Sequence, residues 1–344
     1  MGIPGIAKLR HAGRAVKKWL TPKALILVYH RVIELSADPY LLGVTPQHFA
    51  EHLEVLRRRG RAMRLEQLTQ ALQTGNPPRG AVVVTFDDGY ADNLYTAKPL
   101  LERYDIPATV FVTTGQVGKE REFWWDELER VLLQPGTLPK QLRLTINGTS
   151  WDWDLGATVA YSDGDCRDHR SWNIGKDDPT ARHHLYRALY QLLLLLPDGD
   201  RRTLLDELLR WAGRETLPRP SHRVLSGDEL VRLSEGGLVE VGAHTVTHPV
   251  LSELPAAAQW NEIGQSKAYL EKLLGSTVAS FAYPYGAYTP GTAAIVQAAG
   301  FLSACAALSS TVRGGTDRFQ LPRVLARDWD GEAFDRHLGA FFQR

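Results

Sequence analysis

Short apolar runs alternate along the chain with amphipathic segments. The runs are rich in β-branched and aromatic residues, which is typical of buried strands, and the amphipathic segments carry apolar residues at helical spacing. The predicted strands are residues 24–29, 81–86, 108–113, 238–241, 280–283, 302–308 and 321–325. The predicted helices are residues 46–59, 91–104, 226–234, 255–274, 290–299 and 331–342. Strands that alternate with helices indicate a largely parallel sheet with covered faces.

These predicted strands favour an α/β fold, specifically a distorted (β/α)7 barrel of mostly parallel strands. Polar residues collect just after the carboxyl ends of the strands, which is where such barrels keep their active sites. An open, doubly wound sheet is the alternative.

The alternation stops between about residues 115 and 222. Helical patterns cover residues 123–133, 180–196 and 199–212, and residues 161–179 are polar and rich in Gly and Asp. Asn147-Gly148 separates two short apolar runs and predicts a β-hairpin. We interpret this stretch as an α+β insertion carried on a barrel that spans residues 24–344.

The composition excludes some classes of protein. A net charge of +1 gives no reason to expect a polyanionic partner such as nucleic acid. Cys166 and Cys305 are the two cysteines, so neither a disulfide framework nor a cysteine-based zinc site is expected. No segment reaches the roughly 18 to 20 apolar residues that a membrane span needs.

The first 23 residues form a basic arm without any acidic residue. Its apolar residues fall loosely at helical spacing, which leaves two hypotheses: a solvated arm, which we favour, and a short helix on an anionic membrane surface. The arm lacks the continuous apolar stretch of a signal peptide. We therefore expect a cytoplasmic protein, with peripheral contact to the inner membrane through residues 1–23 as an alternative.

Two polar motifs follow predicted strands. Asp87 and Asp88 end the strand at 81–86, and His244 and His248 follow the strand at 238–241. Alone, the first motif is as well explained by an Asp-Gly turn, and the second by a polar loop. Together they lie at the carboxyl ends of strands in one sheet, where two imidazoles and a carboxylate can bind a metal ion and leave it open to a substrate.

The motifs Thr-Phe-Asp-Asp-Gly-Tyr (85–90) and His-Thr-Val-Thr-His (244–248) resemble those of the polysaccharide deacetylase family, carbohydrate esterase family four. The resemblance covers about residues 24–114 and 223–330. It implies that Asp88, His244 and His248 bind a divalent metal ion, normally Zn²⁺, with Co²⁺ or Ni²⁺ as alternatives. It also implies that Asp87 is the general base that activates water.

Residues 281–286, Phe-Ala-Tyr-Pro-Tyr-Gly, resemble the third motif of that family. This implies that the backbone N–H of Tyr285 helps to hold an oxyanion, with Pro284 fixing the turn. Thr245 would orient the two histidines through hydrogen bonds within their loop. The motif normally contains an arginine that braces the general base, and here that position is Ala282. Arg323 or Arg31 could supply the missing guanidinium.

The family's usual C-terminal histidine is missing, but Leu27-Val-Tyr-His30-Arg31 ends the first predicted strand. This arrangement resembles a subgroup of exopolysaccharide deacetylases whose motif order is permuted, so that the strand with its histidine comes first. Because the first and last strands of a barrel are neighbours, His30 can occupy the same point in space. It implies that His30 is the general acid for the leaving amine. The alternative is a histidine that only caps a strand end.

The function that this resemblance implies is removal of N-acetyl groups from amino sugars of a polysaccharide or a lipid-linked glycan precursor. Three alternatives stay open: a deacylase for a formyl or O-acetyl group, an amidase for non-sugar amides, and an inactive carbohydrate-binding protein. Several tryptophans of the insertion could stack on sugar rings, although we expect most of them to pack the insertion onto the barrel. They are Trp124, Trp125, Trp151, Trp153 and Trp172.

Overall fold

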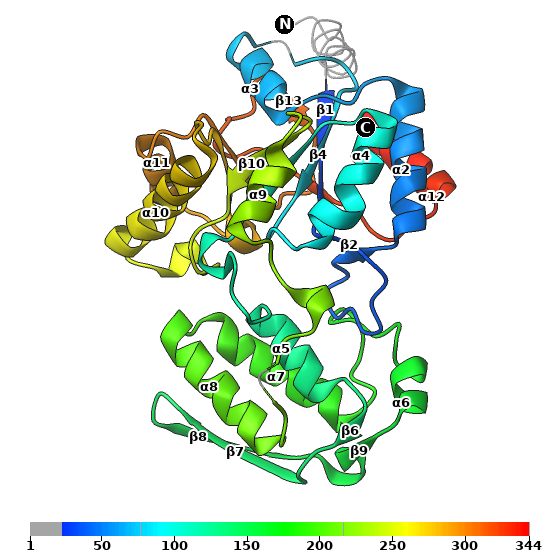
Figure 1. Ribbon diagram of the computed structural model, residues 1–344, viewed down its shortest axis with the longest axis vertical. Helices are drawn as coiled ribbons and strands as arrows, with labels where there is room; N and C mark the ends of the chain where they lie inside the picture. The colour runs from blue at the N-terminus through cyan, green and yellow to red at the C-terminus, as the bar shows by residue number, and fades with distance from the viewer. Residues whose placement is uncertain (1–22, 76, 216, 344) are drawn as a thin grey trace, which may run out of the picture.

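The computed structural model describes residues 23–75, 77–215 and 217–343 (Figure 1). A unit built around the sheet lies above a smaller, mostly helical unit that is formed by the middle of the chain. Apart from Lys23, the predicted basic arm lies outside the described residues, and so does the question of its membrane contact. No helix within the described part of the chain is long and apolar enough to cross a membrane.

Seven parallel strands form the sheet, in the order β14-β1-β4-β5-β10-β11-β12. Their bounds are β1 Lys23–Tyr29, β4 Val82–Phe86, β5 Ala108–Val112, β10 Val239–Ala243, β11 Ser280–Ala282, β12 Ser303–Cys305 and β14 Val324–Leu325. A short antiparallel strand, β13 (Val312–Arg313), pairs with the start of β1. Each parallel strand overlaps a predicted run, although β12 and β14 are shorter than predicted.

The sheet curls so that one short segment of the chain pairs with both β12 and β1. Leu321 pairs in parallel with Cys305 at the end of β12, and β14 pairs with β1 a few residues later. One segment, residues 321–325, therefore contacts both edges of the sheet. This confirms the distorted (β/α)7 barrel over the open sheet.

Helices cover the outside of the barrel (Figure 1). They are α2 Pro46–Arg59, α3 Leu65–Gln73, α4 Lys98–Tyr104, α9 Gly227–Ser234, α10 Ala256–Leu274, α11 Pro290–Ala298 and α12 Gly331–Gln343. α2 shows why the sequence folds this way: the Thr45 side chain caps its first turn, Pro46 occupies the first helical position, and Gly60 ends it at a φ of 64°. The predicted helix at 91–104 begins as a π-helical turn, Asn93–Ala97, before α4.

The insertion has its own buried apolar cluster, which includes Leu128, Leu144, Leu189 and Leu208. Its helices are α5 Trp124–Leu132, α6 Asp163–Asp168, α7 Ala181–Leu194 and α8 Asp198–Trp211. Its strands are β6 Gly136–Thr137, β7 Gln141–Ile146, β8 Thr149–Asp154 and β9 Ala160–Tyr161, and β7 and β8 form the predicted hairpin. The division of the chain into arm, barrel and insertion remains a prediction.

The register of the strands aligns their carboxyl ends. Tyr29 pairs with Phe86, and Ala243 pairs with both Val112 and Phe281. The polar residues that follow these strands therefore leave the sheet at one level. A pair of short strands, β2 (Arg31–Val32) and β3 (Gly43–Val44), continues the chain beyond β1.

Candidate active site

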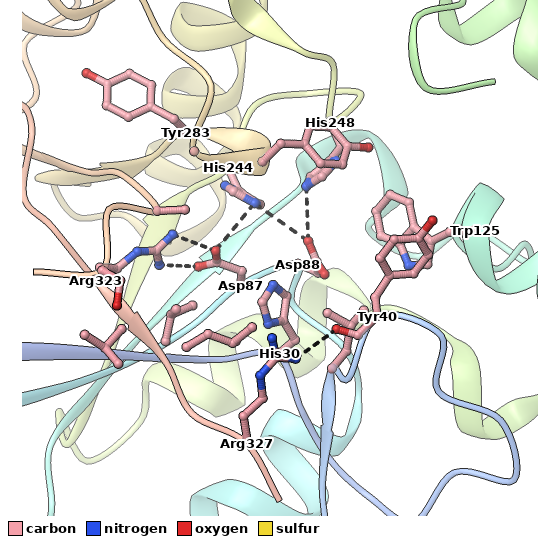
Figure 2. Close-up of a pocket in the computed structure, with 18 of the residues that line it drawn as sticks. His30, Tyr40, Asp87, Asp88, Trp125, His244, His248, Tyr283, Arg323 and Arg327 are labelled. Atoms are coloured by element: carbon pink, nitrogen blue, oxygen red, sulfur yellow. Dashed lines mark hydrogen bonds and ion pairs between the residues drawn. The ribbon is translucent and has the colours of Figure 1, made fainter. Parts of the chain in front are cut away.

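The aspartate and the two histidines predicted to bind a metal converge at this end of the barrel (Figure 2). One oxygen of Asp88, Oδ1, lies 3.4 Å from Nε2 of His248 and 3.7 Å from Nε2 of His244. All three side chains are buried. Asp88 Oδ1 has no hydrogen-bond partner among the described residues. A buried carboxylate oxygen without a donor is costly unless a cation compensates it.

Burial shifts the pKa of all three side chains, and a bound cation would compensate the buried charge of Asp88. Burial raises the pKa of Asp88 well above its ordinary value, and the neighbouring Asp87 carboxylate adds to the effect. Burial lowers the pKa of His244 and His248, so both imidazoles are neutral. His244 Nδ1 lies 2.8 Å from the carbonyl oxygen of Ala282, and a hydrogen bond donated there leaves the Nε2 lone pair facing the aspartates.

Hydrogen bonds hold the histidine loop in place. The hydroxyl of Thr245 donates to the carbonyl of His244 and accepts from the N–H of His248 at 3.0 Å. The carboxylate of Glu262, on α10, accepts hydrogen bonds from the N–H groups of Val246 and Thr247, at 2.8 Å each. Sequence reasoning found Thr245 but missed Glu262, which belongs to no motif.

Strained backbone gathers at the same place. Seven non-glycine residues in the described chain have a positive φ, and four of them are Asp88, Thr245, His248 and Tyr285. Such conformations cost of order 1–3 kcal/mol each and persist where the surroundings fix them, often at functional sites.

The general-base candidate, Asp87, forms a buried bidentate ion pair with Arg323. The two Nη atoms of Arg323 donate to the two carboxylate oxygens at 2.6 and 2.7 Å. Burial alone would raise the pKa of Asp87, but the Arg323 guanidinium holds it well below its ordinary value. Arg31, the other candidate, lies elsewhere: it forms an ion pair with Asp92 at 3.0 Å.

His30 follows β1 and lines the same cavity as the metal trio. Its Nδ1 is buried without a hydrogen-bond partner in the described part of the structure. Burial lowers the pKa of His30 to about 4, although the nearby Asp87 carboxylate acts in the opposite direction. The imidazole is therefore neutral at neutral pH.

The third motif forms a tight turn over the histidines. Residues 284–286 make a short 3-10 turn that places the Tyr285 ring 4.6 Å from that of His248. Pro284 is buried at its start, and Gly286 has a φ of 67°. A Cβ on Gly286 would lie 2.4 Å from the side chain of Ala307, so this turn requires glycine.

A cavity of about 570 Å³ contains these groups, a size suited to a small organic ligand. Barrel residues line it together with Trp125 and Tyr190 of the insertion and Tyr40 of the loop after β2. Of the tryptophans in the insertion, Trp125 is the one that lines the cavity. Trp124, Trp125 and Trp172 are buried, and Trp151 is 40% exposed.

Comparison with known proteins agrees with these motifs. The family model described as polysaccharide deacetylase matches residues 74–137 and 210–304. YxkH of Bacillus subtilis (strain 168), whose name refers to polysaccharide deacetylation, is 28% identical over 111 residues, 32% of this chain and 38% of that protein. A poly-beta-1,6-N-acetyl-D-glucosamine N-deacetylase of Staphylococcus aureus (strain N315) is 28% identical over 116 residues, 30% of this chain and 40% of that protein. The chain thus spans about two fifths of the length of these curated relatives.

Solved structures share the fold over nearly the whole chain. IcaB from Ammonifex degensii aligns with a TM-score of 0.58 at 20% identity and covers 94% of this chain and 98% of its own. The Streptococcus pyogenes deacetylase PplD aligns with a TM-score of 0.57 at 19% identity and covers 92% and 99%. The sequence match on both sides of the insertion is to a polysaccharide deacetylase domain, and these solved structures share the fold of the chain.

Proposed function

We propose that this protein is a metal-dependent hydrolase that removes N-acetyl groups from amino sugars of a polysaccharide or a lipid-linked glycan precursor. The observation that carries the proposal is the convergence of Asp88, His244 and His248 beside the Asp87–Arg323 pair in one cavity. The name of the Staphylococcus aureus relative supports an acetylated amino sugar as the class of substrate.

The three side chains fit a divalent cation. Ligand atoms about 2.0–2.2 Å from a tetrahedral ion lie roughly 3.4 Å from one another, close to the 3.4 and 3.7 Å found between Asp88 Oδ1 and the two Nε2 atoms. Neutral imidazoles with one carboxylate favour Zn²⁺, with Co²⁺ and Ni²⁺ as alternatives. Three protein ligands also leave room for a substrate, which a structural site would not.

In this proposal each remaining residue has one task. When held by Asp88, His244 and His248, a divalent ion would supply Lewis-acid chemistry for the acyl carbonyl and for water. Asp87, kept ionised and oriented by Arg323, takes the proton of the attacking water. The backbone N–H of Tyr285, aimed by the turn at Pro284, donates to the developing oxyanion. His30 starts neutral, so the proton that it delivers to the leaving amine is the one that Asp87 takes from the attacking water.

The central test is acetate release from chito-oligosaccharides by protein reconstituted with Zn²⁺, Co²⁺ or Ni²⁺. We expect Asp87→Asn to lower kcat by about 10³-fold with its metal content unchanged, because general-base catalysis contributes on that scale. Full metal occupancy with no release from any acylated glycan would favour the binding-protein alternative. Release of formyl or O-acetyl groups alone would favour the other deacylase, and release from non-sugar amides alone would favour an amidase.

His30 has its own test. We expect His30→Gln to lower kcat by about 10²-fold while the metal content stays full, because the leaving amine then lacks its proton donor. A kcat near that of the wild type would reject the assignment and leave His30 a buried residue beside the site.

A further inference from the structure

We infer that Arg327 receives an anionic group of the substrate, a carboxylate or a phosphate that lies next to the acylated amino sugar. The inference rests on the proposed function, because it places that sugar in the cavity of the candidate site. Arg327 lines this cavity together with His30 and Tyr40. Figure 2 shows its guanidinium next to the His30 imidazole.

Arg327 has few partners for a half-buried guanidinium. One nitrogen, Nη1, donates to the carbonyl oxygens of Tyr40 and Leu41 over long distances of 3.3 and 3.4 Å. Within the described chain, no carboxylate forms an ion pair with Arg327, and no acceptor takes a hydrogen bond from its Nε or Nη2. Burial lowers the pKa of Arg327, and Asp38 is the acidic residue whose charge acts to raise it. The carboxylate of Asp38 already accepts hydrogen bonds from the N–H groups of Leu42 and Gly43.

The other arginine of the cavity is already saturated. Arg323 donates two short hydrogen bonds to Asp87, so that guanidinium and that carboxylate satisfy each other. Arg327 therefore keeps a donor edge available inside the cavity. The planar fork of a guanidinium matches the paired oxygens of a carboxylate or a phosphate.

The charge of the cavity also favours an anionic group of the substrate. Its lining contains two aspartates, Asp87 and Asp88, and two arginines, Arg323 and Arg327, whose formal charges cancel. A bound divalent ion would therefore leave this set of groups with a net positive charge. A positive, partly enclosed cavity attracts anions and disfavours cations.

Three probes test the inference on zinc-loaded protein: a neutral N-acetylglucosamine dimer, N-acetylglucosamine linked to glucuronic acid, and N-acetylglucosamine 1-phosphate. Calorimetry gives the Kd of each probe, and acetate release gives kcat/KM. We expect at least one anionic probe to bind about 10-fold more tightly than the neutral dimer at low salt, on the scale of a charge-assisted hydrogen bond. The probe that shows this preference identifies the group as a carboxylate or a phosphate.

Variants connect the preference to Arg327. We expect Arg327→Gln to abolish it while the affinity for the neutral dimer stays within about twofold, and Arg327→Lys to keep part of it. Arg318→Gln is the matched control: Arg318 is also half-buried and packs over the Phe319 ring, but it lies outside the cavity.

Equal affinity for all three probes would overturn the inference, and so would an equal loss of affinity for all of them in Arg327→Gln. Acetate release without a charge preference also overturns it, but leaves the proposed function standing. Binding of an anionic probe that depends on Arg327, without release from any probe, supports the inference and contradicts the proposed function.

Discussion

Asp87 is a buried carboxylate that the protein keeps charged through a single guanidinium. Arg323 donates to both of its oxygens, and the side chains of both residues are less than one tenth exposed. The motif that residues 281–286 resemble normally supplies such an arginine, whereas this chain has Ala282 there. Arg323, just before β14, instead brings a guanidinium to Asp87.

Lysine in place of Arg323 should separate orientation from charge. Arg323→Lys retains a positive charge but offers no planar fork, so Asp87 loses its fixed orientation. We expect kcat to fall by about 10- to 100-fold, with unchanged metal content and little change in KM. Steady-state kinetics and metal analysis check this, with Arg318→Lys as the control. A wild-type kcat would show that the pair is only structural.

Among single residues, the sequence predicted the members of short motifs better than residues that meet only in the folded chain. Asp87, Asp88, His244 and His248 belong to two short motifs, so they could be named directly. The choice between Arg323 and Arg31 stayed open because the ion pair with Asp87 joins residues 236 positions apart. The position of Arg327 beside His30 depends on the closure of the barrel, which no local pattern encodes.

The histidine loop is an element whose shape depends on a neighbouring helix. Glu262 on α10 binds two backbone N–H groups and the hydroxyl of Thr247, all at 2.8 Å. We expect Glu262→Gln to weaken Zn²⁺ binding by about 10- to 100-fold, as is common when groups that orient metal ligands are changed. Competition with a zinc chelator measures the affinity. An unchanged Kd would show that the loop keeps its shape without this carboxylate.

The first turn of α9 should give stability a defined pH dependence. Glu229 accepts hydrogen bonds from Arg223 at 2.6 and 2.7 Å and from the N–H of Ser226 at 2.8 Å, and these contacts, with that of Arg223 largest, lower its pKa to about 2. Since the pKa is lower in the folded state, the stabilisation is complete above the unfolded value of about 4.3 and is lost as the pH falls toward 2.

Glu229→Gln should therefore reduce the free energy of unfolding by about 1–2 kcal/mol at pH 7 and by much less near pH 2.5. Urea unfolding of both proteins at several pH values measures this. A difference between the two proteins that is the same at pH 7 and pH 2.5 would contradict the assignment.

Strong capping signals made α2 and α9 predictable, and weak signals hid α3 and α6. Thr45 and Ser226 both cap a helix with a side-chain oxygen, whereas Arg64 occupies the N-cap of α3. α6 has six residues and buries none of them, so its segment showed no apolar period. The long runs of β1, β4 and β5 were evident because these strands are buried throughout.

In the whole molecule, the insertion completes the cavity that the barrel begins. Trp125 on α5 lies 5.0 Å from the ring of His248, and Tyr190 on α7 lines the same cavity. Arg219, on the segment that returns to the barrel, binds Glu122 at 2.8 Å and Glu129 at 2.6 Å. The sequence predicted the insertion, but its position over the site follows from these long-range contacts.

Arg219→Met should loosen the insertion before the barrel. It leaves two buried carboxylates with less compensation, so we expect a loss of about 3 kcal/mol in the free energy of unfolding. The substitution should accelerate hydrogen exchange more in α5, α7 and α8 than in β4 and β5. Equal acceleration in both units would mean that they unfold as one, contrary to the separate apolar cluster of the insertion.

Anomalous diffraction at the zinc edge, from crystals of the zinc-loaded protein, would test the central claim most directly. We predict one ion within about 2.0–2.2 Å of Asp88 Oδ1 and of Nε2 of His244 and His248, with Asp87 still bound to Arg323. An ion bound elsewhere, or none at this position at saturating zinc, would contradict the proposed metal centre and the reaction built on it.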